Sequence, residues 1–236
     1  MRSSTLLVCG LLLAATAPAA RAHHLWVVGS DSVYTVARGM APDRLDAYDP
    51  SRVTSASALG RDGFPIELTR ADADSSASFM APRPAALVAL RCDWGDRVMT
   101  THGKKFMNRQ GAEEAGLRVL QAFVSTQFGK SLFDTCPAAL DPLGDVFEMV
   151  PLADPLGVAG GDELPVRLLF EGQPMADVEI RSLTGDVVTT NPDGVARLPL
   201  SPDGLQLFMA IHKKALPEST ELDFHKYMSF LTFEVR

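Results

Sequence analysis

The sequence has few cysteines, few aromatic residues and no long apolar run. Only 3 of its 236 residues are Cys, and 7% are aromatic. The longest uninterrupted run of apolar and small residues spans positions 6–15. That is about half of the roughly 20 residues that a membrane-spanning helix needs. We therefore expect no spanning helix and no membrane anchor.

The chain also lacks the short motifs of several common enzyme classes. It has no serine in a Gly-x-Ser-x-Gly elbow, no His-Glu-x-x-His pattern and no glycine-rich phosphate loop. Basic residues are not in excess, because 22 Lys and Arg stand against 29 Asp and Glu, a net charge of −7. An acidic surface repels phosphate backbones. We expect neither an enzyme nor a nucleic-acid-binding protein.

The first 22 residues have the three parts of a secretory signal peptide. Arg2 supplies a positive charge, the apolar run follows, and Ala20-Arg21-Ala22 is a small-x-small cleavage pattern. Cys9 raises the alternative of a lipoprotein, which the bulky Val8 before it disfavours. Cleavage after the pattern leaves 214 residues that begin at His23, with 20 basic and 29 acidic side chains. We expect a soluble periplasmic protein.

Removal of the signal peptide leaves two cysteines, Cys92 and Cys136. An even number of cysteines in an oxidising compartment indicates a disulfide, so we predict a bond between these two. Neither cysteine has a neighbour at the spacing of metal-binding thiolates, so a thiolate metal site is not expected.

Gly and Pro punctuate the chain, with short β-prone apolar runs between them. This pattern predicts a mainly β-protein, which we interpret as two β-sandwich modules at 23–142 and 143–236. About seven short alternating strands in the second module predict an immunoglobulin-like or transthyretin-like sandwich. A single amphipathic helix is predicted between the modules at 111–128, where apolar residues recur near helical spacing. These residues are Leu117, Leu120, Val124 and Phe128.

Five stretches of the sequence carry a family resemblance. They are 22–26 (Ala-His-His-Leu-Trp), 48–50 (Tyr-Asp-Pro), 147–155, 160–174 and 190–194 (Thr-Asn-Pro-Asp-Gly). Together they resemble the bacterial domain of unknown function family 4198 over nearly the whole mature chain. The resemblance implies a secreted protein linked with nickel or cobalt uptake. Its partners would be a metal ion and a transporter component of the inner or outer membrane.

The argument from the residues themselves rests on the five histidines. At an amino-terminal His23, the free α-amine has a pKa near 7.7–8.0, so amine and imidazole can chelate a metal together at neutral pH. In an alternative arrangement, the amine coordinates with the backbone amide and imidazole of His24. The two arrangements compete, because neighbouring side chains in a strand point to opposite faces. Nitrogen-rich sites of this kind suit Cu(II) or Ni(II).

Three other histidines are candidate ligands. His212 ends an alternating strand, and Phe208 on the same face indicates that this face meets the first module near the amino terminus. His225 precedes the last predicted strand, and His102 lies in a basic polar loop. The predicted metal ligands are therefore His23, His24, His212, His225 and His102, for Ni, Co or Cu.

Three functions remain open at this stage. We expect a periplasmic metal-binding protein that captures or delivers nickel, cobalt or copper for uptake, with no catalytic residue. The alternative is a non-catalytic β-sandwich interaction module of the cell envelope, in which the histidines play no part. The third is a copper-dependent oxidase, since amino-terminal copper chelates also serve oxidative polysaccharide-cleaving enzymes. An intact His23 at the terminus of the secreted protein separates the first function from the second.

Overall fold

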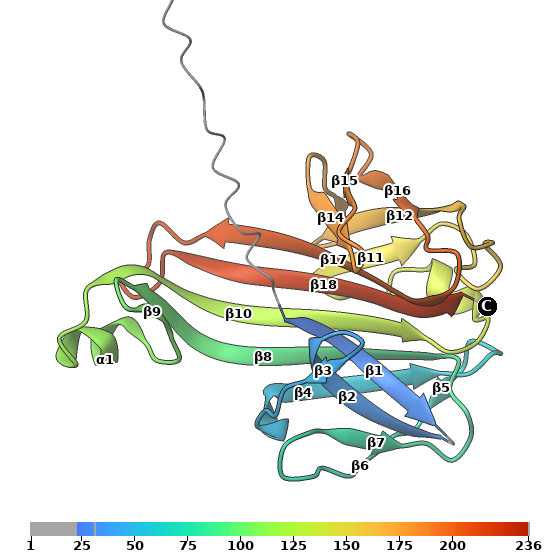
Figure 1. Ribbon diagram of the computed structural model, residues 1–236, viewed down its shortest axis with the longest axis horizontal. Coiled ribbons are helices and arrows are strands. Elements are labelled where there is room, and N and C mark those ends of the chain that lie inside the picture. Colours follow the sequence, from blue (N-terminus) through green and yellow to red (C-terminus); the bar gives the residue numbers. More distant parts are fainter. Residues whose placement is uncertain (1–22, 31, 236) are drawn as a thin grey trace, which may run out of the picture.

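A computed structural model describes residues 23–30 and 32–235 (Figure 1). Strands dominate the described chain, which confirms the prediction of a mainly β-protein. The predicted signal peptide lies outside the described residues. Within the described ranges, no helix is long and apolar enough to cross a membrane. Short helical segments are confined to connections: α1 (Arg109–Glu114) and the 3-10 turns η1 (Pro50–Arg52) and η2 (Pro137–Leu140).

A nine-stranded sheet forms the centre of the molecule. Its order is β15-β14-β17-β18-β10-β8-β4-β5, with β9 paired to β8. The four middle strands are long, and in Figure 1 they extend together toward the end of the molecule that carries α1. The strands of this sheet are β4 (Val53–Leu59), β5 (Pro65–Ile66), β8 (Leu87–Thr100), β9 (Gly103–Lys105), β10 (Val119–Leu132), β14 (Glu179–Ser182), β15 (Val187–Thr189), β17 (Gly204–Ala215) and β18 (Phe224–Val235).

Two smaller sheets pack on opposite faces of the nine-stranded sheet. Along β17, Leu207 and Met209 enter one hydrophobic cluster while Phe208 and Ala210 enter another, as the two-residue period of a strand dictates. One small sheet contains β1 (His24–Ser30), β2 (Val33–Met40), β3 (Arg44–Leu45), β6 (Thr69–Arg70) and β7 (Ser78–Met80). The other contains β11 (Phe147–Pro151), β12 (Glu163–Phe170), β13 (Gln173–Pro174) and β16 (Val195–Pro199).

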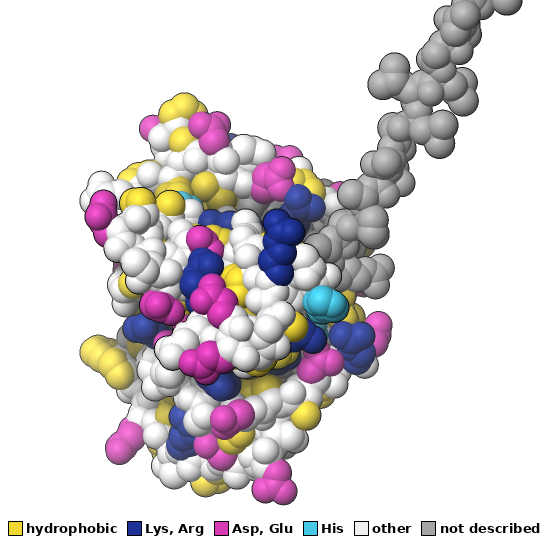
Figure 2. Space-filling model, turned by 90° about the vertical axis from the view of Figure 1, so that its left-hand side faces the viewer, with side chains coloured by type: hydrophobic (Ala, Val, Ile, Leu, Met, Phe, Trp, Pro, Cys, Tyr) yellow, Lys and Arg dark blue, Asp and Glu magenta, His cyan; other side chains and the backbone are white. Residues whose placement is uncertain are grey.

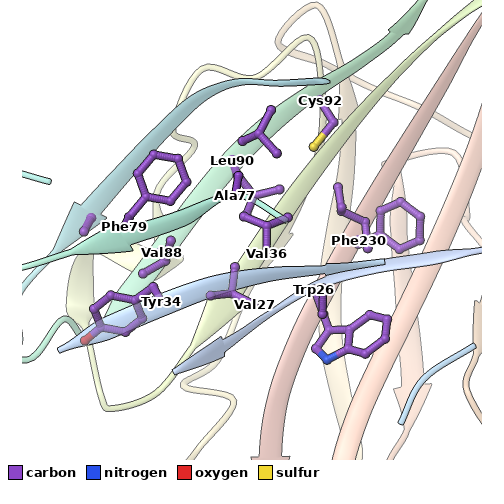
Figure 3. Close-up of a cluster of buried hydrophobic side chains, with 14 of the residues drawn as sticks. Trp26, Val27, Tyr34, Val36, Ala77, Phe79, Val88, Leu90, Cys92 and Phe230 are labelled. Carbon is purple, nitrogen blue, oxygen red and sulfur yellow. The ribbon is translucent and has the colours of Figure 1, made fainter. Parts of the chain in front are cut away.

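We name the two faces of the nine-stranded sheet after their covers. The β1 face carries Met209 and Met228 and packs against β1 and β2, in the cluster shown in Figure 3. The β12 face carries Phe208 and Leu231 and packs against β11 and β12. Each face thus has its own buried core, and the nine-stranded sheet lies between the two cores.

The prediction of an amphipathic helix over 111–128 is wrong for most of that segment. The helix α1 spans only Arg109–Glu114 and is capped by Asn108, whose side-chain oxygen accepts a hydrogen bond from the Gly111 amide at 2.9 Å. From Val119 onward the chain is strand β10, paired with β8 on one edge and β18 on the other. These two rows of backbone hydrogen bonds override the local spacing, and Leu120 on the supposed apolar stripe is 56% exposed.

The nine-stranded sheet contains strands from both sides of the predicted boundary between residues 142 and 143. Strands β17 and β18 follow the boundary, whereas β8 and β10 precede it. Strand β18 runs parallel to β10 from the pair Phe123 and Phe224 to the pair Ser131 and Thr232. Both predicted modules therefore contribute central strands to one hydrogen-bonded sheet.

The structure does not form the predicted disulfide. Cys92 and Cys136 are both buried free thiols. Cys92 lies in the cluster of the β1 face (Figure 3), whereas Cys136 lies in the cluster of the β12 face. The Cys136 thiol donates to the Gly60 carbonyl at 3.4 Å. Because the two side chains enter cores on opposite faces of the sheet, their sulfur atoms do not meet.

Candidate functional site

The first described residues are held against the hairpin formed by β2 and β3. His24 pairs with Gly39 across β1 and β2, and its Nδ1 accepts a hydrogen bond from the Ala41 amide at 3.2 Å. Gly39 has a φ of 152°, and a Cβ placed there would lie 1.9 Å from the Arg44 carbonyl oxygen. Only glycine therefore lets this hairpin close, and the closed hairpin brings Asp46 back toward the amino terminus.

His23 meets the carboxylate of Asp46. Nδ1 of His23 lies 2.5 Å from Oδ2 of Asp46, and the two side chains are 35% and 24% exposed. Both atoms are buried, and no other group of the described residues is hydrogen-bonded to either of them. The same carboxylate lies 3.3 Å from Nε of Arg44 and 3.9 Å from Nη1 of Arg38. An imidazole and a carboxylate, both with ligand atoms directed inward, thus form the candidate site.

The electrostatic surroundings favour neutral imidazoles at this site. Burial lowers the pKa of His23, and the charge of Arg38 lowers it further, while Asp46 opposes both effects. Burial, followed by the neighbouring His23, also lowers the pKa of His24. A metal binds the unprotonated imidazole. Protons therefore compete less for these two rings than they would for exposed histidines.

His212 and His225 lie in a different environment, on the β12 face. The His212 ring centroid is 4.6 Å from that of Phe170 and 6.5 Å from that of Tyr227. The His225 ring stacks on Tyr227 with centroids 4.0 Å apart, and its Nε2 lies 2.9 Å from Oγ1 of Thr126. Burial is the leading cause that lowers the pKa of each histidine. These rings act as packing and hydrogen-bonding groups among aromatic neighbours.

The five histidines are not brought together. The predicted approach of His212 to the amino terminus is wrong, because the face that carries Phe208 packs against β11 and β12 rather than β1. His102 is exposed in the turn between β8 and β9, where its backbone N–H donates to Oγ1 of Thr100 at 3.1 Å. Within residues 23–30 and 32–235, no group of three or more His, Cys, Asp or Glu side chains is arranged to hold a metal.

Sequence reasoning missed Asp46 as a neighbour of His23. No metal-ligand spacing links the two residues, because their contact depends on how β1, β2 and β3 align. The nearest signal in the sequence is Gly39, whose special conformation permits the turn back. Without the register of these strands, however, that glycine does not identify the residue that approaches His23.

A comparison with models of known protein families shows which family the chain belongs to. A family model described as "Domain of unknown function (DUF4198)" matches residues 20–214, which is most of the chain. The chain belongs to this family. The resemblance predicted from the sequence is therefore confirmed, and the DUF4198 match includes His23, Asp46 and His212 but ends before His225. No curated protein and no solved structure matches the chain.

Proposed function

We propose that the mature protein captures a divalent transition metal in the periplasm and delivers it to a membrane transporter component. Nickel, cobalt and copper are the candidate metals. The proposal includes removal of the first 22 residues as a signal peptide, which makes His23 the amino terminus. The single observation that carries it is the approach of the His23 imidazole to the Asp46 carboxylate.

The donor atoms suit a borderline metal ion. After cleavage, the α-amine and Nδ1 of His23 would close a six-membered chelate ring, and Nδ1 is the ring atom that faces Asp46. The Asp46 carboxylate would supply a third ligand on the same side. Imidazole nitrogen suits copper and nickel, and a carboxylate commonly joins such a set. Asp46 thus takes the place that the sequence analysis gave to His212.

The positive neighbours of Asp46 bear on how strongly a metal is held. Arg38 and Arg44 approach the same carboxylate that would bind the metal. Their charges disfavour a cation, so we expect weaker binding than at a site whose carboxylate lacks such partners. Moderate affinity agrees with capture and hand-over rather than with permanent storage.

Calorimetry on four proteins tests the proposal. Residues 23–236 should bind Cu(II) or Ni(II), and one Ala added before His23 should weaken binding by about 100-fold because the amine moves away. Asp46→Asn should weaken it by at least about tenfold, because losing a direct ligand should cost no less than the roughly 10- to 100-fold lost with an outer partner. His102→Ala is the matched control and should leave affinity unchanged. Equal affinity in the original and the extended protein would refute the amino-terminal chelate.

The same protein tests the oxidase alternative. Copper-loaded protein that consumes a reductant and oxygen with turnover would belong with copper-dependent oxidases, whereas a carrier gives no turnover. A protein that binds no transition metal at all would leave the non-catalytic interaction module as the function.

We also propose that the part of the chain after residue 143 forms an immunoglobulin-like or transthyretin-like sandwich. Leu164 and Leu168 of β12 share one core with Phe208 of β17 and Phe233 of β18. Two facing sheets with a common core support that architecture. An experimental structure with a different strand order would refute the comparison with those folds.

A further inference from the structure

Four cationic side chains gather on the β1 face, beside the amino terminus. They come from four different strands, namely Arg38 of β2, Arg97 of β8, Lys104 of β9 and Lys226 of β18, and we call them the cationic cluster. Figure 2 shows this end of the molecule, with basic side chains on the surface near the start of the described chain.

Shared neighbours and strand register place the members of the cluster. Arg97 and Lys104 lie against the same ring, because Cζ of Arg97 is 4.2 Å and Nζ of Lys104 is 5.7 Å from the Phe106 centroid. The Cζ atom of Arg38 lies 4.5 Å from the centroid of the Trp94 ring. Trp94 lies on β8, the strand that also carries Arg97. Lys226 lies two residues before Met228 on β18, so both side chains point to the same face of the sheet.

Of the four cluster members, only Arg38 lies within 4.0 Å of a carboxylate of the described residues, that of Asp46, while Asp93 and Asp96 act on Arg97 from a longer distance. Across the described ranges, no carboxylate lies within 4.0 Å of the charged nitrogens of Arg97, Lys104 or Lys226. Arg97 donates from Nη1 to the Asp96 carbonyl at 2.7 Å instead. Burial, together with the charges of neighbouring cations, lowers the pKa of Arg97 to about 10 and that of Lys226 to about 8. Crowding of like charges and their burial are both unfavourable.

Two buried donors in the same place also lack acceptors. Trp94 is only 6% exposed, and its Nε1 has no hydrogen-bond partner. Nε of Arg38, whose guanidinium covers the Trp94 ring, has none either. Folded proteins rarely leave buried donors unsatisfied, so these two groups call for an acceptor that is not a side chain of the described residues.

We propose that the cationic cluster binds a small anion that carries at least two negative charges on oxygen, either a polycarboxylate or a phosphate. Guanidinium groups bind both carboxylate and phosphate oxygens through paired N–H donors, and lysines add point charges. A bound anion would neutralise Arg97, Lys104 and Lys226 and accept from the unsatisfied donors. This site requires no metal and goes beyond the proposed metal-carrying function.

The test measures anion binding by the full mature chain, residues 23–236, after a chelating resin has removed metal ions and in buffer free of polycarboxylates and phosphate. Citrate and inorganic phosphate are titrated separately by calorimetry, with acetate as the monovalent comparison. We expect citrate, phosphate or both to bind at least about tenfold more tightly than acetate. Tighter binding of citrate identifies a polycarboxylate ligand, and tighter binding of phosphate identifies a phosphate ligand. A failure to bind metal in the calorimetry above leaves this result unaffected, because the anion titrations use metal-free protein.

Matched lysine variants locate the site. Lys104→Met and Lys226→Met should each weaken binding of the preferred anion at least about tenfold. Lys105→Met removes the same charge from β9 on the opposite face and should change affinity less than about twofold. The absence of binding to both multivalent anions would overturn the proposal. So would equal losses in Lys104→Met and Lys105→Met, because they would indicate a response to net charge alone.

Discussion

On the β12 face, His212 and His225 are packed between aromatic rings, whereas on the β1 face His23 meets a carboxylate and a guanidinium. The rings of the β12 face have aromatic neighbours that fill space, and the His225 ring also shares a hydrogen bond with Oγ1 of Thr126. The ring of His23 instead lies against the Asp46 carboxylate, which Arg44 and Arg38 also approach. The comparison shows that the neighbours of a histidine, more than its presence, indicate whether it can bind a metal.

Two lysines show the same difference between the faces. Lys130 on the β12 face is 4% exposed, and its Nζ lies 2.7 Å from Oε1 of Glu148. The Glu148 carboxylate also accepts from the amides of Leu143 and Gly144. Lys226 on the β1 face is half-buried near other cations, with no carboxylate of the described residues in reach. The charge of Lys130 is therefore neutralised within the fold, whereas Lys226 has no such partner among the described residues, as we expect of a residue in an anion site.

The largest effect is expected from separating the two predicted modules. A fragment of residues 143–236 should lack a cooperative thermal transition, because it removes the parallel partner β10 from the edge of β18. It also uncovers the β1 face of β17 and β18, which carries Met209, Met228 and Phe230. Calorimetric melting of the fragment and of residues 23–236 provides the comparison. A cooperative transition in the fragment would support two independent domains.

Removing one lysine from each face should affect the free energy of unfolding differently. Lys130→Met leaves Glu148 buried without its partner and should cost about 3–5 kcal/mol in the free energy of unfolding. Lys226→Met removes a crowded, partly desolvated charge and should leave stability unchanged or raise it at pH 7. Urea unfolding of both variants checks this. Similar losses in the two variants would contradict the difference that we draw between the faces.

The effect of Lys226 should depend on pH. Its pKa in the folded protein is about 8, below the ordinary 10.5, so its protonated form is disfavoured by folding. The destabilisation is complete below pH 8 and disappears as the pH rises toward 10.5, because the folded state then holds fewer protons than the unfolded state. The stability difference between Lys226→Met and the original protein should therefore shrink between pH 8 and 10.5. A constant difference over that range would argue against a desolvated ammonium.

The smallest effect is expected from thiol labelling, which replaces no residue and tests only where the two cysteines lie. Cys92 and Cys136 are buried on opposite faces, so we expect almost no reaction with a bulky alkylating reagent in the folded protein. Unfolding without reductant should then give two labelled thiols in the mature chain. Mass spectrometry counts the labels. An unfolded protein that takes up no label would support the disulfide that the sequence predicts.

The sequence predicted individual strands better than it predicted which strands pair with one another. Alternation at Leu207 and Met209 identified β17, because side chains two positions apart on a strand enter the same core, although Phe208 and Ala210 between them are buried in the opposite core. The spacing of Leu120 and Phe128 failed, since β10 is buried between two neighbouring strands and its pattern is set by them. Likewise, His23 was identified from chemistry, but Asp46 depends on the register of β1 with β2 and of β2 with β3. Local sequence contains no record of such long-range pairing.

Histidine ring signals followed by NMR test the central claim most directly. Sub-stoichiometric Cu(II), added to residues 23–236 at pH 7, broadens the signals of nearby protons. We predict that the signals of His23 and His24 broaden first and that those of His212 and His225, across the nine-stranded sheet, stay sharp. Early broadening of His212 and His225 with sharp His23 signals would contradict a metal site on the β1 face.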